Sequence, residues 1–439
     1  MYLKCMFIAA MAATTGGDPM NTLLTLEEPA APRDQNRPPA PDWRAFTEMG
    51  FRPLYLAGCA WALISVLLWV FAPARLTGLL TAMPWHAHEM LWGFVATIAV
   101  GFLLTAGANW TGKNPLRGLP LALLCGVWLV ARAAYLAPGT AALYVAAGAD
   151  LLFFLWGAAA LGRSVWVTRN RRNYGVPLLL VALAAAHVLY VRAALAGDYL
   201  ALMRYFNAGL LNMAVLTLLI ARRVIPFFAK RAVAGLDIAP HTRSGHWQLA
   251  TGVLAIACLL AGAPRLAALL LAATGLIALA QWLAWKPWAA RRVPLLWILY
   301  AGYAGLGIGL LVGAAQLAGY VLRPAWPAHV IGVAGFSVLI LGMATRTALG
   351  HLGRPLRTDR SMVLSYALVI LAALLRLAAL LPTAGALGLL HASAGAWALA
   401  FGLYLWRFTP WMIRPRFDAP AKGAAPMMRI VPAGPRQAP

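Results

Sequence analysis

Residues 84–94, PWHAHEMLWGF, govern how the rest of this chain is interpreted. His86, His88 and Glu89 stand at the start of an apolar segment that runs to about residue 106. Apolar segments of this length span bilayers, and ionisable side chains inside them are costly and functional. We therefore interpret the stretch as a ligand cluster for a haem or a metal ion, close to one face of a membrane.

The composition is that of a polytopic membrane protein. Of the 439 residues, 62% are hydrophobic and 11% are charged, whereas soluble proteins carry about 25% charged residues. The formal net charge is +24, from 36 Lys and Arg against 12 Asp and Glu. In so apolar a chain this excess does not indicate a nucleic-acid partner.

Twelve apolar segments predict an all-α protein, because helices satisfy their own backbone groups in lipid. We predict one transmembrane domain at 51–410, a mostly disordered cytoplasmic tail at 1–50 and a basic cytoplasmic tail at 411–439. Both Met1 and Met20 remain candidate starts. The predicted segments are 53–72, 86–106, 119–136, 140–161, 177–195, 203–224, 247–262, 265–285, 294–318, 327–348, 361–381 and 386–408.

Basic residues alternate along the loops and predict the orientation. Loops after even-numbered segments carry Lys and Arg, and the other loops are short and nearly uncharged. The positive-inside rule then places both termini in the cytoplasm, and the excess charge reflects topology and contact with an anionic bilayer. The residues that carry this signal include Lys113, Arg117, Arg163, Arg169, Arg171, Arg172, Arg222, Arg223, Lys230, Arg231, Lys286, Arg291, Arg292, Arg354, Arg357 and Arg360.

With this orientation, the buried polar groups gather in the outer half of the membrane, apart from two near its middle, Asp150 and His187. A haem in a helix bundle needs imidazole ligands and an apolar slot, and its propionates need cationic partners. We expect a haem there, of b type. Its candidate ligands are His88, His329, His187 and His391, and its candidate propionate partners are Arg132, Arg192, Arg204 and Arg376. The alternatives are hydrogen-bonded core histidines and arginines that extend to the interface.

The spacing of His86 and His88 predicts two directions, because helical residues two apart point about 200° away from each other. Met90 shares the face of His86, and imidazole with thioether suits copper. We therefore place His88 toward a haem and His86 toward copper. The alternative is one working and one interfacial histidine.

A weak internal sequence similarity suggests a partner for this stretch. WHAH at 85–88 and WPAH at 326–329 align with an offset of 241 residues. We predict that His329 pairs with His88, and we include it in the copper set of His86, His88, Met90 and His329. At the opposite, inner end, Arg346 and His351 predict a second polar site, with a helix cap as the alternative.

These motifs together resemble the NnrS family. The resemblance rests on residues 86–90 with 93–94, on 109–112 (NWTG), on 223–228 (RVIPFF) and on 345–356. It implies a twelve-helix bacterial inner-membrane protein that contains haem and copper and protects against nitric oxide and nitrosative stress, often alongside denitrification.

The resemblance leaves the reaction open. A haem that binds or reduces nitric oxide would need protons, which Glu89 is placed to relay, and an electron donor that the sequence does not identify. Two alternatives are a copper-handling transporter and an assembly or regulatory protein. Motif-bearing segments two, six and ten also suggest three four-helix units, as in the core subunits of haem–copper oxidases.

Overall fold

The computed structural model describes residues 39–239 and 241–418, and these lie in one compact unit, Pro39–Asp418. Regular structure in this part of the chain is entirely helical, as predicted. Residues 1–38 and 419–439, with most of the two predicted tails, lie outside the described residues. The short helix α2 (Trp43–Phe46) belongs to the folded unit, since the Asp42 backbone N–H donates to the carbonyl of Ile413 at 2.8 Å.

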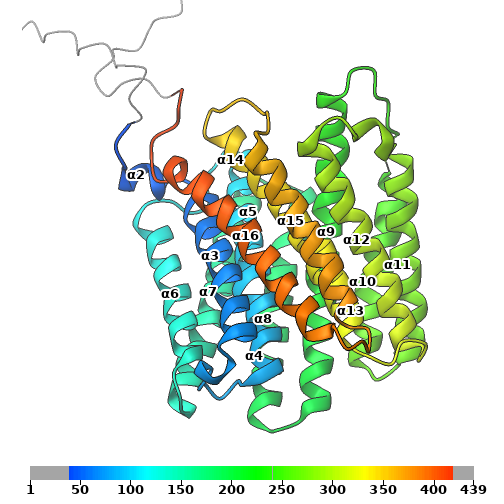
Figure 1. Cartoon of the computed structure of the whole chain (residues 1–439). Coiled ribbons are helices and arrows are strands. Elements are labelled where there is room, and N and C mark those ends of the chain that lie inside the picture. The colour runs from blue at the N-terminus through cyan, green and yellow to red at the C-terminus, as the bar shows by residue number, and fades with distance from the viewer. Residues whose placement is uncertain (1–38, 240, 419–439) are drawn as a thin grey trace, which may run out of the picture. The chain divides into compact units, whose positions relative to one another are not determined.

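The predicted segments correspond to long helices (Figure 1). The second and tenth spans are each built from an α-helix, a π-helical stretch and a second α-helix. The helices are α3 (Phe51–Phe71), α4 (Ala82–His88) with η2 (Glu89–Val95) and α5 (Ala96–Thr111), α6 (Leu119–Leu136), α7 (Thr140–Val167), α8 (Gly175–Leu195), α9 (Tyr199–Ala232), α10 (Thr242–Leu260), α11 (Pro264–Ala284), α12 (Pro294–Leu317), α13 (Ala325–His329) with η5 (Val330–Ser337) and α14 (Val338–His351), α15 (Arg360–Ala378), and α16 (Ala386–Met412).

Eleven of the described helical segments are long and apolar enough to cross a membrane. The twelfth, α10, falls short because Arg243, His246 and Gln248 lie in its first two turns. It nonetheless packs between α9 and α11 as the sequence order predicts. The polytopic α-helical fold is therefore confirmed.

The helix bounds repeat along the chain as three four-helix units. The first holds α3 to α7, the second α8 to α11 and the third α12 to α16. The π-helical stretches η2 and η5 begin 241 residues apart, and so do α6 and α15. In the middle unit, α10 begins 123 residues after α6, and α11 begins 124 residues after α7. The sequence similarity between 85–88 and 326–329 is thus part of a repeat of helix positions that extends over the whole bundle.

The second span of each unit reaches the centre of the bundle. Side chains of α5, α9 and α14 surround one small apolar cavity of about 100 Å³, which Ile98, Leu216 and Ile340 help to line. Val95 and Phe336 border both this cavity and a second one beside α4 and α13. Internal repetition therefore brings the two π-helical spans, far apart in sequence, to a shared interior.

Asp359 caps the N-terminus of α15 just outside its membrane-spanning segment. Its Oδ1 accepts the Met362 backbone N–H at 3.0 Å, and its Oδ2 accepts Arg407 Nε at 2.7 Å. Partial burial raises the pKa of Asp359, but hydrogen bonds from Ser361 and Met362 and the Arg407 guanidinium outweigh it, so the pKa lies below its ordinary value. A lowered folded-state pKa means that the carboxylate stabilises the fold above its ordinary pKa and that this is lost as the pH falls through the folded value.

We expect Asp359→Ala to lower the thermal unfolding temperature in detergent, because loss of an aspartate cap costs about 1 kcal/mol. The difference from wild type should be full at pH 7 and should shrink as the pH falls below about 4. Asp237→Ala is the control, since that carboxylate is 94% exposed and 3.8 Å from Lys230. Equal losses in the two variants would contradict the capping role.

Candidate functional site

His86 and His88 face different parts of the protein, as their spacing predicts. His88 is fully buried, and its ring centroid lies 5.2 Å from that of His187 on α8. His86 lines a cavity, where its ring centroid lies 6.3 Å from that of His329. The predicted pairing of His88 with His329 is therefore replaced by two others, because α4 turns His88 away from α13.

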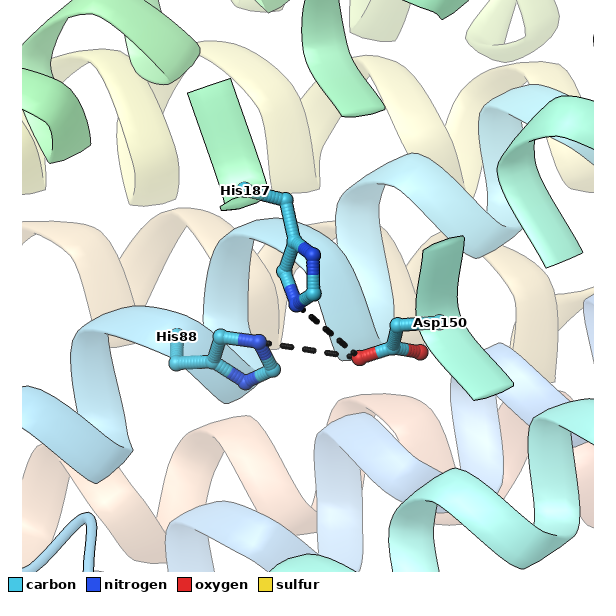
Figure 2. A group of neighbouring side chains, drawn as sticks. All are labelled: His88, Asp150 and His187. Atoms are coloured by element: carbon cyan, nitrogen blue, oxygen red, sulfur yellow. Dashed lines mark ion pairs between the residues drawn. The ribbon is translucent and has the colours of Figure 1, made fainter. Parts of the chain in front are cut away.

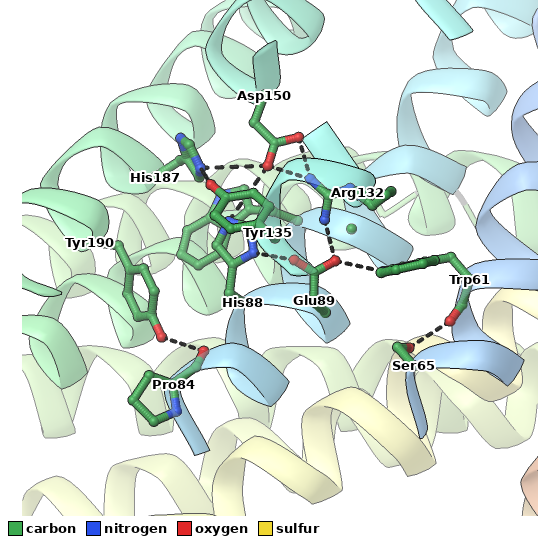
Figure 3. Close-up of polar contacts among 12 residues, drawn as sticks. Trp61, Ser65, Pro84, His88, Glu89, Arg132, Tyr135, Asp150, His187 and Tyr190 are labelled. Atoms are coloured by element: carbon green, nitrogen blue, oxygen red, sulfur yellow. Dashed lines mark hydrogen bonds and ion pairs between the residues drawn. The ribbon is translucent and has the colours of Figure 1, made fainter. Parts of the chain in front are cut away.

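His88 belongs to a group of five buried ionisable side chains that we call the buried polar cluster (Figure 3). Four helical spans supply them. The members are His88 at the end of α4, Glu89 at the start of η2, Arg132 on α6, Asp150 on α7 and His187 on α8.

Hydrogen bonds and ion pairs join all five members. The Arg132 guanidinium bridges Glu89 and Asp150, with Nη1 on the first carboxylate and Nη2 on both oxygens of the second. His88 Nδ1 lies 2.8 Å from Glu89 Oε1, and its Nε2 lies 3.6 Å from Asp150 Oδ2. His187 Nε2 also lies 3.6 Å from Asp150 Oδ2. One carboxylate thus faces two imidazoles and one guanidinium.

The charges of the buried polar cluster do not cancel. Two carboxylates face one guanidinium, so the cluster holds one excess negative charge when both imidazoles are neutral. A net charge inside a membrane span is costly unless it is matched. One proton on the histidine pair or a monovalent metal ion would balance it, and a divalent ion would leave one excess positive charge.

His88, Asp150 and His187 have the donor atoms of a metal site (Figure 2). One ligand atom from each lies within 4.8 Å of the others. Two imidazoles and a carboxylate suit iron, copper or zinc. Glu89 holds His88 Nδ1 in the way that outer-shell carboxylates orient metal-binding histidines. Within the described residues, His88 Nε2 has no hydrogen-bond partner, as expected of an atom reserved for a ligand.

Neighbouring side chains hold the cluster in place. Trp61 Nε1 donates to Glu89 Oε2 at 2.6 Å, and the Tyr135 hydroxyl lies 3.0 Å from His187 Nε2. Gly93 leaves the room that they need, since a Cβ there would lie 2.5 Å from both Arg132 Nη1 and Glu89 Oε2. A metal ion would have to displace the Tyr135 hydroxyl from His187.

Two features of the cluster differ from the sequence predictions. Arg132, a predicted propionate partner, is engaged by protein carboxylates instead. Asp150 is absent from the predicted site residues, although it is an acidic residue in the middle of an apolar segment. Its position in an apolar segment could have identified it from the sequence, because ionisable residues within membrane spans usually indicate functional sites.

The second site is the histidine cavity, of about 300 Å³, which is lined by α3, α4, η2, α9, α13, η5, α15 and α16. Its wall is mostly apolar and aromatic. Its polar and sulfur-bearing side chains include Met83, His86, Met90, His329, Ser393 and Arg376. Met90 therefore lies beside His86, where the sequence placed it. Arg376, a predicted partner of a haem on His88, instead lines the cavity of His86.

Both histidines of this cavity are held in place. His329 Nδ1 lies 2.7 Å from the Ala325 carbonyl, so it carries the proton and Nε2 is free. The His86 ring stacks on Trp69 at 5.2 Å between centroids and 14° between planes. His86 Nδ1 is buried without a hydrogen-bond partner among the described residues. Both imidazoles are thus held in one orientation, and each keeps a ring nitrogen without a hydrogen-bond partner among the described residues.

The other predicted site residues lie elsewhere. Arg192, Arg204 and His391 are exposed on the side of the bundle, and the His391 ring stacks on Phe71 at 5.2 Å. Arg346 and His351 line a third cavity at the opposite end. These five residues therefore join neither the histidine cavity nor the buried polar cluster.

Comparison with known proteins is informative at the family level. A family model described as NnrS protein matches residues 45–416, which is most of the chain. A search of curated proteins finds no match. The matched range contains both sites.

We expect Arg132→Met to destabilise the protein strongly, because removing one partner of a buried ion pair costs about 3–5 kcal/mol. Thermal unfolding in detergent measures this. Adding Glu89→Gln and Asp150→Asn should restore much of the loss, since the carboxamides carry no charge.

The matched control for that variant is Arg192→Met, which changes an exposed arginine on α8. If Arg132→Met unfolds at the same temperature as this control, Arg132 does not neutralise the two carboxylates.

Proposed function

This chain belongs to the NnrS family, whose members act in the nitric oxide response, and from that premise we propose that it is a haem-binding membrane protein that acts on nitric oxide. The haem would lie in the histidine cavity, between His86 and His329. The observation that carries this proposal is the separation of their ring centroids, 6.3 Å with 19° between planes.

At that separation both imidazoles would be close enough to hold one metal ion between them, since a metal–imidazole nitrogen bond is about 2 Å long. The ligands come from α4 and α13, the equivalent helices of the first and third units. Each helix continues into a π-helical stretch, a feature common at functional sites.

The wall of the cavity suits a macrocycle with acidic edge groups. Phe94, Phe336 and Trp397 supply apolar surface, and the cavity volume of about 300 Å³ lies at the lower end of small-molecule sites. Arg376 is its cationic side chain and replaces Arg132 as our choice of propionate partner. A bound haem would supply an iron that transfers single electrons, and nitric oxide would bind that iron by displacing one of the two imidazoles.

The buried polar cluster would serve a second metal. Copper binds mixed nitrogen and oxygen donors most tightly among the divalent first-row metals, and His88, Asp150 and His187 provide them. In this arrangement Glu89 orients His88 rather than relaying protons, because His88, Arg132 and Trp61 already occupy its oxygens.

A second candidate function is copper handling without redox turnover. Met83, Met90, His86 and His329 line one cavity, and this soft donor set suits Cu(I). Such a protein would bind copper in the histidine cavity and would have no haem spectrum.

We further propose that the protein lies in a bacterial inner membrane with both termini in the cytoplasm. The support is the alternation of basic loops. Protease cleavage within residues 222–246 from the periplasmic side would contradict this orientation. The electron donor of any turnover is unidentified.

We expect the purified protein to show a Soret band that shifts when nitric oxide is added. His86→Ala and His329→Ala should each lose or shift the reduced-minus-oxidised spectrum, because each would remove one of the two residues proposed to hold the haem iron. His241→Ala is the control, since His241 lies outside both sites, at the start of α10. Absence of a Soret band in the wild type would overturn the haem proposal.

Metal analysis separates the two sites. We expect His187→Ala and Asp150→Asn to lose a non-haem metal while keeping the haem spectrum. Loss of copper in Met90→Ala with the metal unchanged in His187→Ala would instead place copper in the histidine cavity and favour copper handling.

A further inference from the structure

Three inner-end sequence motifs meet at one cavity, which the proposed function does not use. We call it the basic cavity. Its volume is about 1000 Å³, and α5, α9 and α14 contribute to it at the ends opposite His86 and His329. The motif residues that line it include Trp110, Arg223, Phe227, Phe228, Arg346 and His351.

The basic cavity carries uncompensated positive charge. Arg172, Arg223, Arg231 and Arg346 line it together with His351, and none of the described residues that line it is a carboxylate. Four acidic residues described near this end pair with other cations. These pairs are Glu48 with Arg52, Asp237 with Lys230, Asp359 with Arg407 and Asp418 with Arg416.

Neutral groups hold these arginines in position. Arg223 Nη1 donates to Asn173 Oδ1 at 2.8 Å. The Arg346 guanidinium lies 3.7 Å from the centre of the Phe228 ring, and that of Arg231 lies 4.4 Å from the centre of the Phe227 ring. Such contacts fix a guanidinium without neutralising it.

The charges extend from the surface to the interior. Arg172 and Arg231 are exposed, whereas Arg346 is only 7% exposed. Arginine does not lose its proton in a protein, so a buried one needs an anion or a large energetic compensation. Among the described residues, no ion pair supplies that anion for Arg346.

We infer that the basic cavity binds a ligand through a phosphate group. Planar guanidinium groups bind phosphate oxygens in pairs, and four of them favour a ligand with more than one negative charge. Phe102, Val293 and Leu295 add an apolar wall, and the volume is at the upper end of organic-ligand sites. The ligand is either an acidic phospholipid from the adjoining leaflet or a soluble phosphate compound.

The experiment uses the full-length protein in detergent with three probes: phosphatidylglycerol, phosphatidylcholine and inorganic pyrophosphate. Thermal shift gives apparent affinities, and native mass spectrometry counts retained lipids. We expect phosphatidylglycerol or pyrophosphate to stabilise the wild type and phosphatidylcholine not to do so. Binding should weaken as salt is raised.

Arg346→Gln and Arg223→Gln should each lower the apparent affinity about tenfold, the loss expected for one charge-assisted contact. Arg117→Gln is the charge-matched control, since Arg117 is exposed in the loop after α5, outside the basic cavity. If Arg346→Gln fails to fold, Arg223→Gln and the wild-type titrations still test the site.

The outcomes separate the sources. Preference for phosphatidylglycerol with no response to pyrophosphate identifies a lipid site, and a saturable pyrophosphate response identifies a site for a soluble phosphate compound. No stabilisation by either probe, or equal affinities in Arg223→Gln and Arg117→Gln, would overturn the inference. None of these readouts depends on haem.

Discussion

The bridge from Arg132 to Glu89 and Asp150 is the interaction on which the first half of the bundle depends. A lone charge in a membrane span is costly, so both carboxylates depend on the Arg132 guanidinium between them. The bridge ties the junction of α4 and η2 to α6 and α7, and His88 and His187 then have a fixed carboxylate between them. Gly93 is needed at this point because any side chain there would meet the bridge.

Internal repetition explains how distant stretches of sequence come to share a cavity. Equivalent spans from the first and third units bring His86 and His329 together, each one beside a π-helical segment. The units differ in their side chains. The position equivalent to Glu89 is Val330, so the third unit offers an apolar wall where the first has a charged cluster.

The membrane-spanning helices could be predicted because length and apolarity are local properties of the sequence. The separate directions of His86 and His88 followed from helical geometry alone. The partners of each histidine did not, since they depend on how spans far apart in sequence pack. Arg192 and His391 show a further limit, because an apolar helix gives no sign of which face meets lipid and which meets protein. Asp150 was visible as a buried acid, but only the structure shows that it meets Arg132.

His86 and His88 lie on the same short helix and face different sites. His86 lines the histidine cavity, and His88 belongs to the buried polar cluster. A rotation of α4 that improves the position of one ring must move the other, because a single peptide unit separates Ala87 from each of them. A ligand bound in the histidine cavity would therefore alter the affinity of the buried polar cluster for a metal ion. By linkage, the effect would be equal in the opposite direction. The seven residues of α4 are thus a shared backbone, through which a shift of one histidine would move the other.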